Sequence, residues 1–157
     1  MPLASKFVRD ARILGKRFPM KPSINIITLA VGDLERALRF YRDLGLDSPG
    51  IVGEEFIGDD QQAAGAVVMF KLANVTLALY PRTELSKDAK VPLGPVKTGE
   101  FSIGQLADSR AEVDAVLEQA LAAGATIVDV AHERPWGIYS GYFCDPDGHL
   151  WEIIYNP

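Results

Sequence analysis

One order of elements occurs twice in this 157-residue chain, and this repeat limits the available folds more than any other feature. In each half an apolar strand precedes an amphipathic helix, which stops at Gly45 in the first half and at Gly124 in the second. Further strand-like runs follow, and the last of them ends at Tyr80 and at Tyr155. One half could not bury the apolar face of its own sheet, so two halves or two chains must pair.

The first module covers residues 21–81 and opens with the apolar strand SINIITLAV, residues 23–31. Asp33 is a natural N-cap, and the apolar residues after it recur at helical spacing, which predicts a helix of about 12 residues. Two more strands, joined by a two-residue hairpin, are predicted at 66–72 and 75–80.

Residues 82–99 mix charge, proline and glycine without periodicity, which predicts a linker. The second module, residues 100–157, repeats the order of the first, with Asp108 or Ser109 as the cap of its helix. Its strands after the helix are predicted at 126–131, 141–144 and 150–155. The fold class is therefore α+β, built from two βαβββ modules.

The composition excludes several classes of protein. No run approaches the roughly 18 consecutive apolar residues that cross a membrane. The single cysteine, Cys144, excludes an intramolecular disulfide and a multi-cysteine zinc site, and it favours a reducing cytoplasm. The net charge is −5 although residues 1–20 form a basic segment, which we expect to be a flexible arm. The acidic remainder argues against nucleic-acid binding.

The chain resembles the vicinal oxygen chelate superfamily, which includes glyoxalase I, extradiol dioxygenases and the bleomycin-resistance proteins. The matching segments are VGDLERALRFYRDLGL (31–46), AEVDAVLEQALAAGATIV (111–128) and GYFCDPDGHLWEIIYNP (141–157). The resemblance covers roughly residues 22–157. It implies that the two modules form a curled mixed sheet around a cleft, and that the chain is a homodimer.

In metal-dependent members of this superfamily, four His or Glu ligands come from matching strands of the two modules. The resemblance carries these positions onto Ile26, Leu77, a residue near Ser102, and Glu152. The aliphatic side chains of Ile26 and Leu77 cannot coordinate an ion, and one carboxylate does not hold a divalent metal. We therefore predict no metal site, no cofactor and none of the metal-dependent chemistry of the family.

Glu152 is the residue to which we assign chemistry, because the resemblance places it in the cleft. There it would act as a general acid or base or bind a cationic ligand; alternatively, it is paired with an arginine or a backbone amide. Trp136 and Tyr139 lie near Gly137 and Gly141, a grouping that suits a ligand pocket and also ordinary core packing.

Other residues receive structural roles. We expect His149 to pack in a turn, His132 to face solvent and Cys144 to be an inert buried thiol. The predicted ligand-binding set is Ile26, Leu77, Ser102, Trp136, Tyr139 and Glu152.

The sequence thus predicts a glyoxalase/bleomycin-resistance-like protein that binds a small apolar or aromatic molecule in a metal-free cleft. Two alternatives stay open. One is a metal-dependent lyase, isomerase or dioxygenase with a displaced metal site, and the other is a structural or regulatory dimer with a filled cleft. Whether the chain is an enzyme is left open, and no membrane or nucleic-acid partner is expected.

Overall fold

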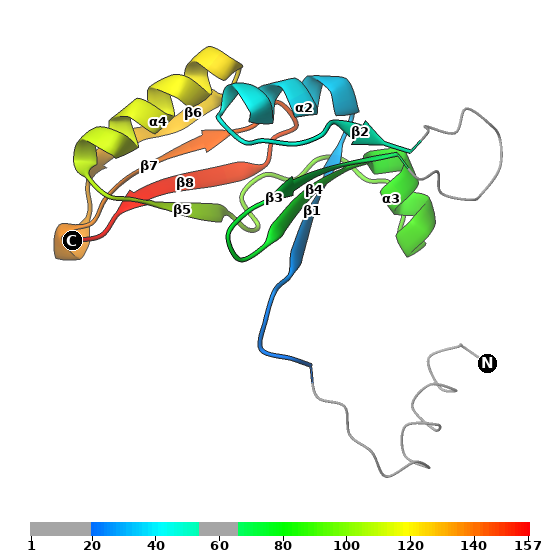
Figure 1. Cartoon of the computed structure of the whole chain (residues 1–157). Coiled ribbons are helices and arrows are strands. Elements are labelled where there is room, and N and C mark those ends of the chain that lie inside the picture. The colour runs from blue at the N-terminus through cyan, green and yellow to red at the C-terminus, as the bar shows by residue number, and fades with distance from the viewer. Residues whose placement is uncertain (1–19, 54–65) are drawn as a thin grey trace, which may run out of the picture.

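The computed structural model of this chain describes residues 20–53 and 66–157. These residues form two four-stranded sheets with the two long helices packed on one side (Figure 1). The expected basic arm, residues 1–20, lies outside the described part of the chain except for Met20.

The first module forms a sheet of strand order β1-β4-β3-β2, in which β1 runs parallel to β4 and the other neighbours are antiparallel. The short strand β2 was missing from the sequence prediction. The elements are β1 (Ile26–Val31), α2 (Leu34–Asp43), β2 (Ile51–Val52), β3 (Val67–Lys71) and β4 (Thr76–Pro81).

The second module repeats this order as β5-β8-β7-β6, with β5 parallel to β8. The predicted repeat of βαβββ modules in the α+β class is therefore confirmed. Its elements are β5 (Ile103–Ala107), α4 (Arg110–Ala123), β6 (Thr126–Glu133), a 3-10 turn (Pro135–Gly137), β7 (Tyr139–Cys144) and β8 (Leu150–Tyr155).

Both long helices begin at the caps that the sequence indicates. The side chain of Asp33 accepts a hydrogen bond from the amide of Arg36 at 2.9 Å, and Ser109 caps α4 by accepting one from the amide of Glu112 at 3.1 Å. Helix α4 ends at Gly124, whose φ of 109° is a conformation that glycine adopts at little cost.

The predicted linker 82–99 contains a helix, α3 (Arg82–Ala89), which is a correction to the prediction. This helix buries a charged residue, Glu84, so it has no apolar stripe that a periodicity search would find. Residues 90–102 after it have no helix or strand, and we call them the connector.

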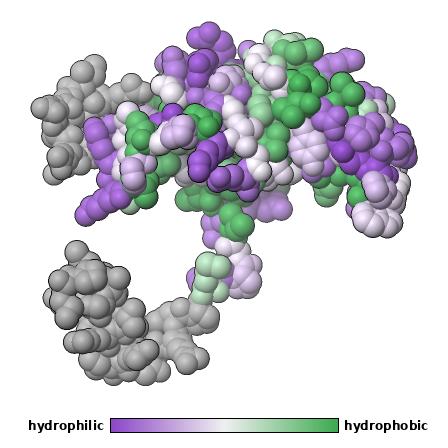
Figure 2. Space-filling view, turned by 180° about the vertical axis from the view of Figure 1, so that it is seen from behind, coloured by the Kyte–Doolittle hydropathy of each residue, from purple (hydrophilic) through white to green (hydrophobic). Residues whose placement is uncertain are grey.

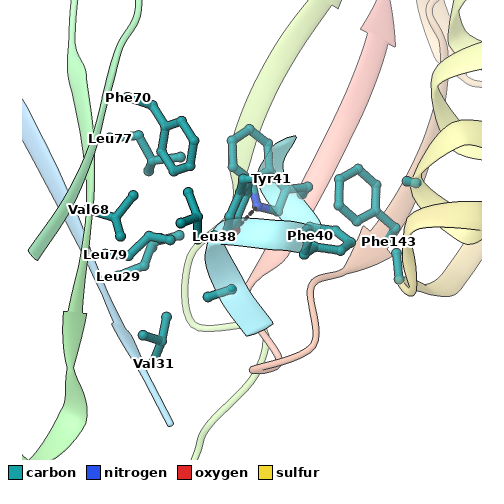
Figure 3. Packing of buried hydrophobic residues seen from close by; sticks show 14 of the residues in the cluster. Leu29, Val31, Leu38, Phe40, Tyr41, Val68, Phe70, Leu77, Leu79 and Phe143 are labelled. Carbon is teal, nitrogen blue, oxygen red and sulfur yellow. Dashed lines mark hydrogen bonds between the residues drawn. The ribbon is translucent and has the colours of Figure 1, made fainter. Parts of the chain in front are cut away.

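Helix α2 lies between the two sheets and contributes side chains to both (Figure 3). Leu38 points toward the strands of the first module. The rings of Phe40 and Phe143 lie 6.4 Å apart, and those of Tyr41 and Trp151 lie 6.0 Å apart. The buried residues of both modules therefore form one shared core.

Each module contributes its own half of the mixed sheet, and in the described part of the chain the two halves do not close on each other. Across the described residues the strands of the two modules stay in separate four-stranded sheets. Helices α2 and α4 cover the same side of the molecule, and the short helix α3 lies at the end of the first sheet, in contact with β1 and β4 (Figure 1). The side of each sheet opposite α2 and α4 is therefore largely uncovered by helices. We call this side of each sheet its outer face.

Candidate functional site

The alternation of β8 places Glu152 on the outer face of the second sheet. Trp151 and Ile153 are buried on the helix side, so Glu152 and Ile154 between and after them point the other way. The neighbouring strand β5 has Gly104 opposite Glu152. Because this glycine has no side chain, it does not cover the carboxylate.

A buried serine connects Glu152 to an arginine. The fully buried Ser140 donates its hydroxyl proton to Glu152 Oε1 at 2.8 Å, and it accepts a hydrogen bond from Arg134 Nε at 2.7 Å. Arg134 also donates to Asp129 Oδ2 at 2.8 Å, and its guanidinium lies 5.3 Å from the ring centre of Tyr142. The carboxylate is thus held in place by a polar chain that ends on a second carboxylate.

Tyr142 lies directly opposite Glu152 in the β7–β8 pair. Burial raises the pKa of the Tyr142 hydroxyl, and the hydrogen bond to Glu152 and the charge of that carboxylate raise it further. Two hydroxyl groups, from Ser140 and Tyr142, therefore flank the carboxylate of Glu152.

The hydrogen bonds of Asp129 set its protonation as well. Those from Arg134 and His132 lower the pKa of this carboxyl group despite some desolvation. Asp129 is therefore an anion that balances the arginine near neutral pH.

A hollow of about 410 Å³ opens beside Tyr142 on this outer face. Most of its wall is apolar, with one aromatic ring from the connector and one from β7. The lining residues are Gly99, Phe101, Ser102, Val128, Tyr142 and Leu150. We call it the Tyr142 hollow; the predicted site residue Ser102 is part of it, and Glu152 lies next to its wall.

The structure separates Leu77 from Glu152. Leu77 is 1% exposed and packs in the core beside α2 (Figure 3), so it points away from the outer face. The outer face of the first sheet instead carries Ile26, which is 60% exposed and pairs with Thr76.

Tyr139 and Trp136 also lie away from Glu152. Tyr139 packs against the core and donates a hydrogen bond to Asp114 of α4 at 2.8 Å. Trp136 is 90% exposed on the 3-10 turn, with a φ of 65° that is rare for a residue with a side chain.

Ser140 and Arg134 are among the site residues that sequence reasoning missed, as are Phe101 and Tyr142 of the hollow. A serine in a strand and an arginine before a proline carry no signal of mutual contact, because the register shifts between β6 and β7 decide which side chains meet.

The residues present do not fit a divalent metal of the superfamily. The carboxylate of Glu152 is hydrogen-bonded to the hydroxyl groups of Ser140 and Tyr142. The middle of the outer face of the first sheet carries Thr28, Ala78 and Met69, which are neighbours on adjacent strands. In residues 20–53 and 66–157, no three His, Cys, Asp or Glu side chains are grouped closely enough to hold a metal ion.

A buried polar cluster joins the two modules on the helix side. Asp145 Oδ2 accepts a hydrogen bond from the hydroxyl of Tyr41 at 2.6 Å and lies 2.8 Å from His149 Nδ1. The Tyr41 hydroxyl in turn accepts one from Trp151 Nε1 at 3.2 Å.

Burial and the charge of Asp145 raise the pKa of the Cys144 thiol, which makes it a poor nucleophile.

Several large apolar side chains reach the surface. Figure 2 shows hydrophobic side chains beside the extended segment that leaves the body. Exposed members on the outer faces include Ile26, Met69, Leu106 and Val128. No helix in the described part of the chain has the length and apolar character needed to cross a bilayer.

The comparison with protein families identifies this arrangement. Residues 23–153 match the model of the Glyoxalase/Bleomycin resistance protein/Dioxygenase superfamily. The chain belongs to this superfamily, as its paired βαβββ modules already indicated.

Solved structures with the same fold include two that are 28% identical to this chain. A glyoxalase-related enzyme from Fulvimarina pelagi has a TM-score of 0.72, over 87% of this chain and 90% of its own. Lactoylglutathione lyase from Agrobacterium tumefaciens has a TM-score of 0.59, over 87% of this chain and 95% of its own.

A curated relative matches over a shorter segment. Protein Mb0911c of Mycobacterium bovis is 43% identical over 42 residues, which is 27% of this chain. This chain therefore spans 28% of the length of that relative.

Proposed function

We propose that this protein binds a small apolar or aromatic molecule in the Tyr142 hollow without a metal, and that Glu152 is its polar anchor. The main support is the placement of the Glu152 carboxylate. It is held by Ser140 at 2.8 Å and lies opposite Tyr142, which lines a hollow with largely apolar walls.

The rings of Phe101 and Tyr142 favour a planar ligand. Both line the hollow, and an aromatic group packed on such rings gains about 0.5–1.5 kcal/mol beyond its area burial. A hydrogen-bond donor on the ligand would reach the carboxylate of Glu152. If the ligand is also a substrate, the same carboxylate is the group that accepts its proton.

A pair of matched probes tests this proposal. Phenol carries a donor and anisole does not, although their rings are alike. Calorimetric titration should show that Glu152→Gln weakens phenol binding at least about fivefold, a loss of roughly 1 kcal/mol, and leaves anisole binding unchanged. The control Glu118→Gln, on the exposed side of α4, should alter neither. Equal binding of phenol to the wild type and Glu152→Gln would refute the anchor.

We further propose that the chain acts as a cytoplasmic homodimer. Exposed apolar residues such as Ile26 and Leu106 on the outer faces support it, and so do the strands β1 and β5 at the sheet edges. Light scattering that gives a mass near the 17.1 kDa of one chain across micromolar concentrations would contradict it.

A further inference from the structure

A second cavity lies where the two modules meet, between the end of β1, the connector and the turn before β8. Its volume is about 210 Å³, and Ala30, Val96 and Leu150 are among its apolar walls. We call it the junction cavity. It shares part of its wall with the Tyr142 hollow, but neither Glu152 nor Tyr142 lines it, so its occupant is independent of the anchor proposed above.

Asp147 lines this cavity, and its carboxylate is a buried acceptor of which only one oxygen has partners. Its side chain is 6% exposed, and Oδ1 accepts hydrogen bonds from Gly32 N at 2.8 Å and Arg36 Nη2 at 2.9 Å. Within the described residues, Oδ2 is the buried side-chain atom that has no hydrogen-bond partner. A buried carboxylate oxygen without a donor is costly, so Oδ2 calls for a donating group from a ligand or from water.

Two cations line the same cavity. Arg82, the first residue of α3, donates from Nη2 to Gly94 O at 2.6 Å and has further N–H groups to offer. Lys97 on the connector is 3.9 Å from Glu100, and its side chain is 70% exposed, so this ion pair is loose. The residues that line the cavity therefore include one with an unused acceptor and two with cationic donors.

We propose that the junction cavity binds a small zwitterion with an apolar side chain, chemically an α-amino acid. Its ammonium group donates to Asp147 Oδ2, and its carboxylate accepts from Arg82 and Lys97. A zwitterion carries one positive and one negative group, so it can pair with the carboxylate and with the cations at the same time. Neither of its charges is then buried without a partner. The apolar walls receive its side chain.

Three matched probes test the ligand class on the unaltered protein. L-Valine carries both charged groups, 3-methylbutanoate lacks the amine, and isobutylamine lacks the carboxylate. Calorimetric titration should give saturable binding of L-valine, with each of the other two at least about tenfold weaker. Failure of L-valine to bind, or equal binding of all three, would overturn the proposal.

Asp147→Asn tests the residue. The asparagine keeps an acceptor for Gly32 and Arg36 and places an amide donor where Oδ2 was, so it should weaken L-valine binding about tenfold or more. Arg82→Gln should weaken it as well, whereas Glu152→Gln should leave it unchanged and lower phenol affinity only. A crystal structure in saturating L-valine that shows only a water on Asp147 Oδ2 would also overturn the proposal.

Discussion

The hydroxyl of Tyr41, on the helix of the first module, donates a 2.6 Å hydrogen bond to Oδ2 of Asp145, in the turn of the second. Both residues are buried, and their partners His149 and Trp151 also come from the second module. Burial and the charge of Asp145 raise the pKa of Tyr41 well above its ordinary value, so the phenol stays neutral and remains a donor.

Tyr41→Phe removes this donor and leaves Asp145 and the Trp151 indole each short of a partner. We expect the free energy of unfolding to fall by about 1–3 kcal/mol, measured in urea. Tyr139→Phe is the matched control, since its hydrogen bond to Asp114 is exposed and should be worth less. Equal losses in the two variants would show that burial of the Tyr41 bond adds nothing.

Acid should weaken the same contact. Burial by itself opposes ionisation of Asp145, but hydrogen bonds from His149 and Tyr41 outweigh it and lower the pKa of this carboxyl group. A folded-state pKa below the unfolded value stabilises the fold above about pH 4, and this contribution is lost as the pH falls through the folded value.

Asp145→Asn, which cannot ionise, should therefore be less stable than the wild type near neutral pH, and the difference should narrow in acid. Urea titrations at about pH 7 and about pH 3 would measure it. A difference that does not change with pH would contradict the expected ionisation.

Gly141 should not tolerate a side chain. A Cβ atom there would lie 2.6 Å from Leu117 Cδ1 of α4 and 2.9 Å from the amide nitrogen of Ala131. We expect Gly141→Ala to lower the free energy of unfolding by about 1–3 kcal/mol. Gly94→Ala is the control, because nothing lies within 4 Å of its Cβ position. Similar stability of the two variants would mean that α4 shifts without cost.

Loss of the Glu152 charge should be visible at Tyr142. Burial and the carboxylate both raise the pKa of this hydroxyl, so Glu152→Gln should lower it while the burial effect remains. Nuclear magnetic resonance titration of labelled tyrosine would report the change. Tyr80, whose pKa is raised by burial and by Asp88 and Glu84, should titrate as before. An unchanged pKa of Tyr142 in this variant would mean that the Glu152 carboxylate does not interact with the Tyr142 hydroxyl.

The metal prediction concerns the protein as purified. Because the described residues lack a grouped donor set, elemental analysis should find no stoichiometric divalent metal, and a chelator should leave the melting temperature unchanged. About one metal per chain, lost in Glu152→Gln, would contradict this.

The sequence predicted the repeat and the long helices because periodicity and caps such as Asp33 and Ser109 are local signals. It could not predict which face Leu77 occupies. Strand β4 is apolar on both faces, and a shift of one residue exchanges them. The sequence also carried no signal of the contact between Arg134 and Ser140, which depends on an irregular pairing of β6 with β7.

Gly141 shows a similar limit. Its place beside aromatic residues suited both a ligand pocket and ordinary core packing, and the structure places the backbone of β7 tightly under α4. A glycine needed for close packing and one needed for flexibility look alike in a sequence.

The position of α2 between the two sheets restricts how the repeats can change over evolutionary time. Phe40 and Tyr41 belong to the first repeat, but the surfaces against which they pack belong partly to the second. A substitution in one repeat therefore alters the cost of substitutions in the other, and their effects on stability will not add. The two copies of the module are therefore expected to change in a coupled way, because their buried residues form one shared core.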